Sequence, residues 1–177
     1  EPYLLSLCTL EPRKNIVLLL RAFSDFVQTY PTTELNLVLV GISGIKNNSV
    51  FSAVDGSSQI KERIFFTGYL PDKDLADIYS GAKAFIYPSL YEGFGLPPLE
   101  AMQCGTPVIT SNVSSLPEVV GDAGILVNPE QQDEMTHAIW RLVNEDGLCN
   151  MLAQRSLDRA SQFSWAACAD NLMNVYK

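Results

Sequence analysis

The sequence is poor in the residues from which most metal centres are built. Its 177 residues contain one histidine, His137, and four cysteines that never form a CxxC pair. Zinc sites usually need clustered cysteine and histidine ligands, so we expect no metal site. The cysteines are instead expected to be buried, reduced thiols of a cytosolic protein. They are Cys8, Cys104, Cys149 and Cys168.

Basic residues and long hydrophobic runs are also scarce. Twelve Lys and Arg against twenty Asp and Glu give a net charge of −8, which argues against general affinity for nucleic acid or anionic membrane. No apolar run approaches the roughly 18 residues of a membrane span. The start, Glu1-Pro-Tyr, lacks the basic region of a secretory signal. We therefore expect a cytoplasmic protein in which any phosphate recognition is local.

Apolar strand patterns alternate with helical patterns along the whole chain. This alternation predicts one α/β domain over residues 1–177, with a Rossmann-like, doubly wound sheet of six parallel strands. Because the chain opens directly on a strand, we expect it to be part of a longer protein. The predicted strands are 3–8, 35–40, 63–67, 83–87, 105–110 and 123–127, and the predicted helices are 16–30, 73–80, the segment ending at 103, 116–120, 129–144, 148–162 and 165–176, with 46–61 ambiguous.

Several side chains are expected to have structural roles. Asp72 can cap the helix that begins at residue 73. Trp140 and Trp165 are interpreted as packing residues, and Glu118 and His137 as structural or surface residues. The inward face of the first helix is predicted to contain Val17, Leu20, Phe23 (or Ala22) and Val27.

In a doubly wound sheet, ligands bind beyond the carboxyl ends of the strands. The loop after the fourth predicted strand carries the strongest pattern there, with glycines 93 and 95 between Glu92 and Glu100. Prolines 97 and 98 suit the first turn of a helix, whose start offers unpaired N–H groups near Phe94, Gly95 and Leu96 to phosphate. The two carboxylates suit sugar hydroxyls, which need acceptors. The loops that this rule selects are 9–15, 41–44, 68–72, 90–96 and 110–114.

Arg13 and Lys14 follow the first predicted strand, immediately before a helix. Positive charge is mildly unfavourable at a helix N-terminus, so a basic pair there indicates a ligand. We interpret the pair as counter-charges for a diphosphate that rests on the 94–96 amides.

Four stretches, in order, resemble the retaining glycosyltransferases of family four (glycosyl transferases group 1), which have the two-domain GT-B architecture. EGFGLPPLE at 92–100 resembles their E-x7-E signature, and TLEPRKN at 9–15 their diphosphate loop. FTGYLP at 66–71 resembles their nucleobase loop. The segment after the signature (AMQCGTPV at 101–108 and LPEVVGDAG at 116–124) and FSW at 163–165 also match.

The resemblance implies that this chain is the C-terminal, donor-binding domain, and that the N-terminal acceptor domain is absent from it. Lys14 would hold the diphosphate, with Arg13 nearby, and Glu100 would accept from the ribose hydroxyls. Glu92, as the catalytic residue, would meet the sugar. The nucleobase would meet Tyr69, Leu70 and Asp72, and the sugar and phosphate would also meet the backbone of Gly93, Phe94, Gly95 and Leu96.

The implied reaction moves a sugar from a nucleoside diphosphate donor to an acceptor saccharide or lipid-linked glycan, with retention and without metal or cofactor. The 9–15 variant resembles mannosyltransferases of polysaccharide or lipopolysaccharide synthesis and so favours GDP-mannose. We also expect attachment to the inner membrane face through the missing domain. Thr9 departs from the arginine of many relatives, so Arg13 would compensate or diphosphate affinity would be lower. Two alternatives stay open, which are half of a non-hydrolysing nucleotide-sugar epimerase and a non-catalytic nucleotide-sugar-binding subunit.

Overall fold

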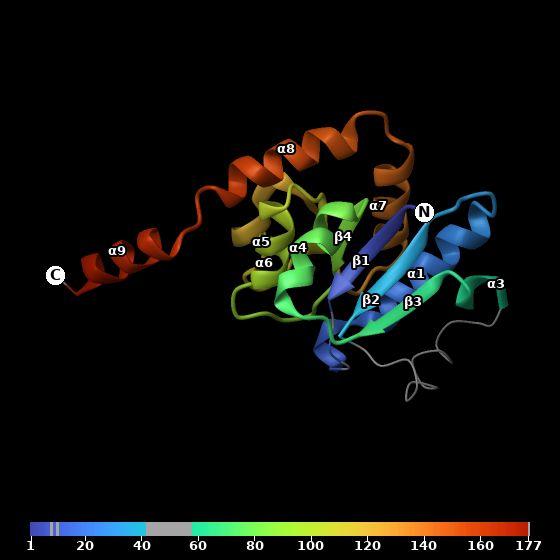
Figure 1. Ribbon diagram of the computed structural model, residues 1–177, viewed down its shortest axis with the longest axis horizontal. Helices are drawn as coiled ribbons and strands as arrows, with labels where there is room; N and C mark the ends of the chain where they lie inside the picture. The colour runs from blue at the N-terminus through green and yellow to red at the C-terminus, as the bar shows by residue number, and fades with distance from the viewer. Residues whose placement is uncertain (8, 10, 42–57, 177) are drawn as a thin grey trace.

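A computed structural model describes residues 1–7, 9, 11–41 and 58–176. Within them, six parallel strands form a single sheet with the order β3-β2-β1-β4-β5-β6 (Figure 1). This is the doubly wound order typical of Rossmann folds, and it confirms the predicted fold class. The strands are β1 (Tyr3–Leu7), β2 (Asn36–Val40), β3 (Ile64–Gly68), β4 (Ala84–Tyr87), β5 (Val108–Ser111) and β6 (Ile125–Val127).

Helices cover both faces of the sheet, which explains why its central strands are nearly continuous apolar runs. One face packs against α1 and α7, and the other against α4, α5 and α6 (Figure 1). The α-helices are α1 (Ile16–Thr29), α3 (Ser58–Lys61), α4 (Asp72–Gly81), α5 (Leu96–Gln103), α6 (Leu116–Val120), α7 (Gln132–Asn144), α8 (Leu148–Ala160) and α9 (Trp165–Val175), and the short 3₁₀ helices are η1 (Pro12–Lys14) and η3 (Gly121–Ala123).

The period-2 geometry of the strands divides the core into two clusters. Leu4 and Ile86 point to the cluster beneath α1 and α7, while Leu5 and Phe85 point to the cluster beneath α4 to α6. Helix α8 contributes to both, because its start packs with the first cluster and its end, at Ala160, with the second.

The inward face of α1 is shifted from the predicted one. Leu20, Ala22, Phe23 and Val27 are buried as expected, but Val17 is 36% exposed. Ile16 and Leu19 are buried instead, so the apolar row follows i, i+3, i+4 from Ile16, one residue earlier than assumed.

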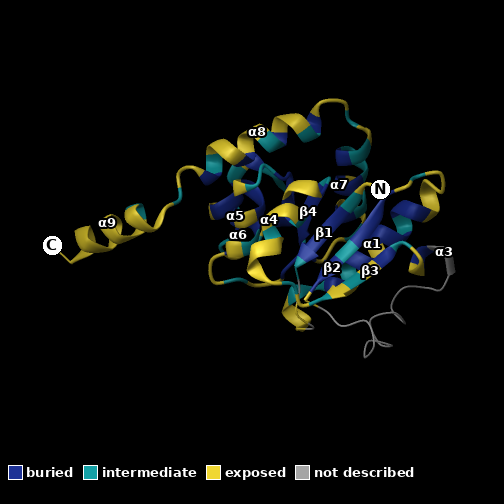
Figure 2. Ribbon diagram, in the orientation of Figure 1, coloured by how far each residue is buried: buried dark blue, intermediate teal, exposed yellow. Residues whose placement is uncertain are grey.

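The C-terminal helix departs most from the sequence prediction. Helix α9 has no buried residue and projects away from the body of the molecule (Figures 1 and 2). Trp165, predicted to pack, is 82% exposed, and Cys168, predicted to be buried, is exposed. A period-3.6 pattern shows that a helix is amphipathic but does not say whether a surface is present to cover it.

The other structural interpretations have mixed outcomes. Trp140 packs partly buried against the core, and the ring of His137 stacks on it with centroids 5.8 Å apart. Cys104 and Cys149 are free thiols of intermediate burial. Of the ambiguous segment 46–61, the described end is helical as α3; Cys8 and the turn 42–44 lie outside the described residues. No helix in the described part of the chain has the length and apolar character that crossing a membrane requires.

Strands β1 and β4 separate toward their carboxyl ends. Their register pairs Leu4 with Ala84 and Leu5 with Phe85, although β1 continues to Leu7 and β4 to Tyr87. The chain order of the sheet reverses between these two strands, and ligands bind at such switch points in α/β sheets. The fold therefore opens a gap at the place where a ligand is expected.

The turn into α5 depends on glycine at position 95. Its φ of 107° is disfavoured for residues with a Cβ, and an added Cβ would lie 2.9 Å from Cδ2 of the buried Leu116. We expect Gly95→Ala to lower the free energy of unfolding by about 1–3 kcal/mol, measured by urea denaturation. Gly93→Ala is the matched control, since a Cβ there meets no atom within 4 Å. Equal stability of the two variants would contradict this account.

Candidate functional site

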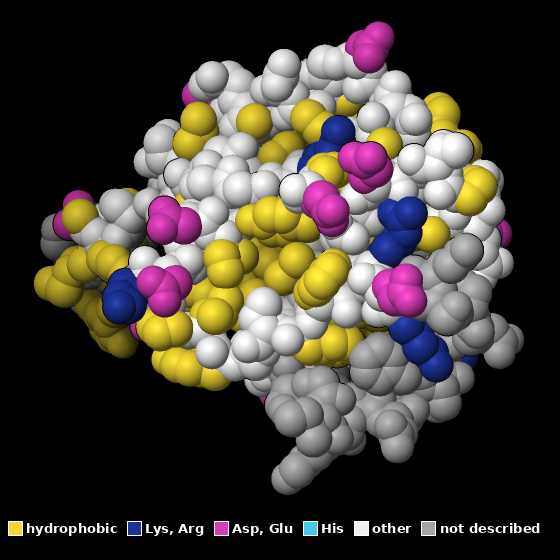
Figure 3. All heavy atoms as spheres, turned by 45° about the vertical axis from the view of Figure 1, so that its right-hand side comes forward, with side chains coloured by type: hydrophobic (Ala, Val, Ile, Leu, Met, Phe, Trp, Pro, Cys, Tyr) yellow, Lys and Arg dark blue, Asp and Glu magenta, His cyan; other side chains and the backbone are white. Residues whose placement is uncertain are grey.

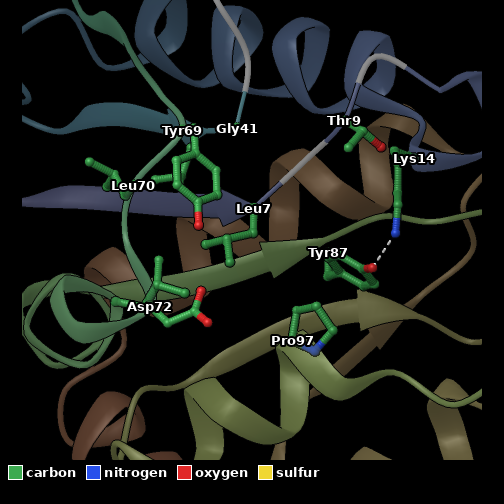
Figure 4. A pocket seen from close by; sticks show the side chains of 11 residues that line it. Leu7, Thr9, Lys14, Gly41, Tyr69, Leu70, Asp72, Tyr87 and Pro97 are labelled. Carbon is green, nitrogen blue, oxygen red and sulfur yellow. Dashed lines mark hydrogen bonds between the residues drawn. The ribbon is translucent and has the colours of Figure 1, made fainter.

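A cleft of about 260 Å³ lies at the switch point (Figure 4). It is built from the carboxyl ends of β1, β2 and β4, the loops that follow β1 and β3, and the first turns of α4 and α5. Three of the five loop regions selected from the sequence, 9–15, 41–44 and 68–72, thus contribute residues to one cleft. The lining residues are Leu7, Thr9, Lys14, Val40, Gly41, Tyr69, Leu70, Asp72, Leu75, Tyr87 and Pro97.

Lys14 is the cation of this cleft. Its side chain is only 11% exposed, and Nζ donates to the hydroxyl of Tyr87 and, at 2.7 Å, to Oε1 of Glu92. The ammonium also lies 4.7 Å from the centroid of the Tyr87 ring. Figure 4 shows the side chain extending from the loop after β1 toward Tyr87 at the end of β4. Lys14 therefore bridges the two strands that separate at the switch point.

Arg13 lies outside the cleft lining and is 44% exposed. Its Nε donates to Oε2 of Glu11 at 2.7 Å, and its Nη1 to Oε2 of Glu92 at 3.1 Å. Thr9, at the position where many relatives have an arginine, donates to Oε1 of Glu11 at 2.6 Å. Arg13, Lys14, Glu11 and Glu92 are thus two cations and two carboxylates, and the group is formally neutral. Both predicted counter-charges already have protein partners.

The pKa values of Glu92 and of the neighbouring Tyr87 are shifted in opposite directions. Burial raises the pKa of Glu92, but hydrogen bonds, including the one from Lys14, lower it by more than burial raises it. The pKa of Glu92 therefore lies below the ordinary value of 4.5. Burial, together with the charge of Glu92, raises the pKa of Tyr87 well above its usual range. At neutral pH, Glu92 is therefore a carboxylate and Tyr87 a neutral phenol.

Serine hydroxyls hold the Glu92 loop from its other side. Ser114, at a φ of 54°, accepts a hydrogen bond from the backbone N–H of Glu92 at 3.1 Å. Ser115 donates to the carbonyls of Glu92 and Phe94 at 3.0 and 2.8 Å. The loop after β5, which contributes no residue to the cleft, thus fixes the loop that does the pairing.

The start of α5 leaves few backbone donors. The helix begins at Leu96; Pro97 and Pro98 have no N–H, and the N–H of Leu99 bonds to the carbonyl of Gly95 at 3.3 Å. An anion at this terminus would therefore meet the amides of residues 94–96 and no later one. Of this segment, Pro97 lines the cleft, while Gly93 to Leu96 lie outside its lining.

The two glutamates of the E-x7-E stretch have different partners. Glu92 pairs with Lys14 and Arg13, whereas Oε2 of Glu100 accepts from the hydroxyl of Tyr79 at 3.0 Å. Neither glutamate lines the cleft, although Glu100 follows Pro97 by one helical turn. The two glutamates are thus held by different neighbours, Glu92 by the cations after β1 and Glu100 by Tyr79 of α4.

The loop after β3 forms the opposite wall. The side chain of Tyr69 is 80% exposed and stands over the cleft, with Leu70 and Asp72 beside it (Figure 4). Asp72 was predicted to cap α4, but the N-cap residue is Pro71 and makes no side-chain cap bond. Asp72 is instead the first helical residue, where a carboxylate is favoured by the helix dipole, and its side chain remains available to the cleft.

Comparisons with known proteins identify the family of this chain. Residues 1–159 match the family described as "Glycosyl transferases group 1". The chain belongs to this family. It is 42% identical over 177 residues to the O-antigen chain mannosyltransferase B of Escherichia coli. This match covers all of this chain and 46% of that protein. It is 34% identical over 173 residues to the serotype-specific mannosyltransferase WbdA of Escherichia coli, covering 96% of this chain and 21% of that protein.

Solved structures extend the likeness of this group 1 glycosyltransferase. Sucrose-phosphate synthase of Thermosynechococcus elongatus superposes with a TM-score of 0.81 at 29% identity, over 99% of this chain and 45% of that one. TarM superposes with a TM-score of 0.84 at 20% identity over 100% of this chain and 35% of that one, and shows the fold alone. The chain thus spans less than half the length of each of these relatives.

Sequence reasoning missed Tyr87 and Pro97 as lining residues of the cleft. Both lie in the motif region, but Tyr87 was interpreted only as the end of a strand. The available signal was topological, since the last residue of a strand beside the switch point faces the ligand crevice. Leu7, at the end of β1, satisfies the same rule and also lines the cleft.

One face of the molecule shows how its charges are distributed. On the face in Figure 3, hydrophobic side chains gather in the centre, and Lys and Arg side chains stand apart from one another among acidic ones. Within the described residues, no three His, Cys, Asp or Glu side chains are grouped as a metal site would require.

The lowered pKa of Glu92 predicts how stability depends on pH. The ionised carboxylate stabilises the fold fully above pH 4.5, the ordinary value, and this contribution is lost as the pH falls through the lower folded pKa. Glu92→Gln should therefore be destabilised relative to the wild type at neutral pH, and the difference should shrink as the pH falls below 4.5, as measured by urea unfolding.

Glu145→Gln is the surface control for that experiment. Glu145 forms an exposed pair with Arg141 at 2.7 Å, so its contribution should be smaller and should vanish at high salt. A Glu92→Gln difference that stays constant or grows on acidification would show that the Lys14–Glu92 pair does not stabilise the fold.

Proposed function

We propose that this chain is the nucleotide-sugar-binding domain of a hexosyltransferase. The enzyme would transfer a sugar from a nucleoside diphosphate donor to an acceptor hydroxyl, with retention of anomeric configuration and without a metal ion. The observation that carries the proposal is the position of Lys14, a nearly buried cation on the wall of the switch-point cleft. Membership of the group 1 glycosyltransferases supports the class of reaction.

The donor capacity of Lys14 fits one phosphate contact. An ammonium has three N–H bonds, and those directed to Tyr87 and Glu92 leave one for a phosphate oxygen in the cleft. Arg13 keeps N–H groups beyond those bonded to Glu11 and Glu92. With the amides of residues 94–96, these groups would hold the diphosphate from two sides.

In the transfer, the bond between the anomeric carbon and the diphosphate oxygen breaks, the acceptor oxygen bonds to that carbon, and the acceptor hydroxyl passes its proton to the departing diphosphate. Negative charge develops on the departing diphosphate, where Lys14, Arg13 and the amides stabilise it. Glu92 is ionised and paired, so we assign it the role of hydrogen-bond acceptor for sugar hydroxyls rather than of proton donor. Its carboxylate would also keep Lys14 oriented toward the cleft.

The remaining donor groups have candidate partners around the same cleft. The backbone at Tyr69 and Leu70, with the carboxylate of Asp72, would meet the nucleobase on the wall after β3. Glu100, beyond Pro97 on α5, would accept hydrogen bonds from the ribose hydroxyls. In these assignments the base of the donor lies against the loop after β3, the ribose against α5, and the sugar against the Glu92 loop.

The donor sugar that we favour is mannose, carried as GDP-mannose. The support is the identity to two mannosyltransferases, one named for the O-antigen chain. Because the chain covers 46% of the first relative, we propose that a further domain binds the acceptor saccharide or lipid-linked glycan. The complete enzyme would then act in cytoplasmic polysaccharide or lipopolysaccharide synthesis, attached to the inner membrane face through that domain.

The proposal predicts binding without turnover for these 177 residues. The chain should bind nucleoside diphosphates and nucleotide sugars, with GDP and GDP-mannose ranked first in a thermal-shift panel followed by calorimetry. It should not transfer sugar, because the acceptor wall is missing, whereas the longer protein should. Multiple-turnover transfer by the 177 residues would disprove the divided site, and an absence of nucleotide binding would disprove the donor-domain assignment.

Lys14→Ala tests the diphosphate contact. Loss of a charge-assisted hydrogen bond is worth about 1.5–3 kcal/mol, so calorimetric affinity for GDP should fall roughly 10- to 100-fold. Lys83→Ala, which removes a lysine before the amino end of β4, is the control and should bind as the wild type does. Unfolding measured in parallel separates lost binding from lost stability. Unchanged affinity in a folded Lys14→Ala protein would remove Lys14 from the site.

A further inference from the structure

Glu100 would be a loosely held acceptor without help from a neighbouring helix. It is exposed on α5, and a glutamate side chain in water samples several rotamers. Within the described part of the chain, its carboxylate has one recorded hydrogen bond, from the hydroxyl of Tyr79 at 3.0 Å. That bond occupies Oε2 and leaves Oε1 for another donor.

Tyr79 is a rigid anchor for this bond. Its side chain is 2% exposed, and its ring packs edge-on against Phe85 of β4, with centroids 5.2 Å apart. Its carbonyl accepts from Oγ1 of Thr106 at 2.7 Å and from the N–H of Ala82 at 3.0 Å. The ring, the backbone and the hydroxyl of Tyr79 are therefore tied to three different parts of the fold.

The hydroxyl can donate a hydrogen bond to the carboxylate only if it keeps its proton. Burial, followed by the charge of Glu100, raises the pKa of Tyr79 far above its usual range, so the phenol stays neutral at all physiological pH values. A neutral phenol facing a carboxylate donates its proton in the hydrogen bond. The orientation of the bond is thus fixed by chemistry as well as by packing.

We propose that Tyr79 is a positioning residue that holds the Glu100 carboxylate for the ribose diol of the donor, and so helps to select ribonucleotides over nucleotides that lack these hydroxyls. The proposal rests on the assignment of Glu100 to the ribose. Groups that orient a ligand-binding side chain reduce the conformational freedom lost on binding. Tyr79 does this from α4, through the hydrogen bond of its hydroxyl to Oε2 of Glu100.

The test compares each variant with itself, so that differences in folding cancel. Calorimetry gives the affinity of the 177-residue protein for GDP and UDP and for their 2′,3′-dideoxy counterparts. We expect Tyr79→Phe to lower the preference for the ribonucleotide about 2- to 10-fold, the factor for losing one immobilised side chain, while affinity for the dideoxynucleotide stays unchanged. Adding Glu100→Ala to Tyr79→Phe should lower the preference no further than Glu100→Ala does alone.

Tyr3→Phe is the matched control. The hydroxyl of Tyr3 donates to the carbonyl of Ile78, also on α4, at 2.7 Å, so this variant removes a hydroxyl beside the same helical turn without reaching Glu100. Its ribonucleotide preference should equal that of the wild type. An equal loss in Tyr3→Phe and Tyr79→Phe would overturn the proposal, since both would then act through the stability of α4.

The experiment also separates this proposal from the assignment beneath it. If Glu100→Ala loses the ribonucleotide preference and Tyr79→Phe keeps it, Glu100 binds the ribose without Tyr79 and the proposal fails alone. If Glu100→Ala keeps the preference, Glu100 does not bind the ribose and both fail. If neither GDP nor UDP binds, the proposed function fails and the role of Tyr79 fails with it.

Discussion

The ion pair between Lys14 and Glu92 joins the two strands on which the site depends. Strands β1 and β4 form ladder pairs only at Leu4 and Leu5 of β1. The order in which successive strands are added to the sheet also reverses between these two strands. Side chains span the gap that follows, with Lys14 reaching Tyr87 and Glu92 over 73 and 78 residues of sequence. The cleft remains open because this bridge is made by side chains and not by continued strand pairing.

The charges of this bridge explain how an acidic protein keeps two cations at a helix start. A basic pair before α1 opposes the helix dipole, and Lys14 is nearly buried, so an unpaired ammonium would be costly. Glu11 and Glu92 compensate both cations. An anion at such a site would add contacts to cations that already have carboxylate partners. Phosphate recognition would then depend on these few side chains and not on the net charge of the chain, which is −8.

Two neighbouring hydroxyls give the two glutamates of the E-x7-E stretch different surroundings. Glu92 lies with Tyr87 and two cations, whereas Glu100 has the hydroxyl of Tyr79. A carboxylate held by cations has its charge compensated by them. A carboxylate held by a neutral phenol keeps an uncompensated negative charge, which can accept hydrogen bonds from a ligand. The same residue type can therefore serve different parts of a ligand, and the sequence spacing between the two does not reveal this difference.

The sequence by itself determined the alternation of strands and helices, hence the doubly wound sheet, and it located the loops at 9–15, 68–72 and 92–100, because apolar periodicity and glycine and proline positions are local properties. It misjudged the burial of Val17 by one residue of helical phase and the start of α4 by one residue at Asp72. It also predicted packing for Trp165, but a helical pattern does not show which surface covers the helix. Only the tertiary structure decided that Lys14 pairs with Glu92 and Glu100 with Tyr79. Those pairings depend on which strands lie side by side, and strand order is a property of the whole sheet that no local pattern encodes.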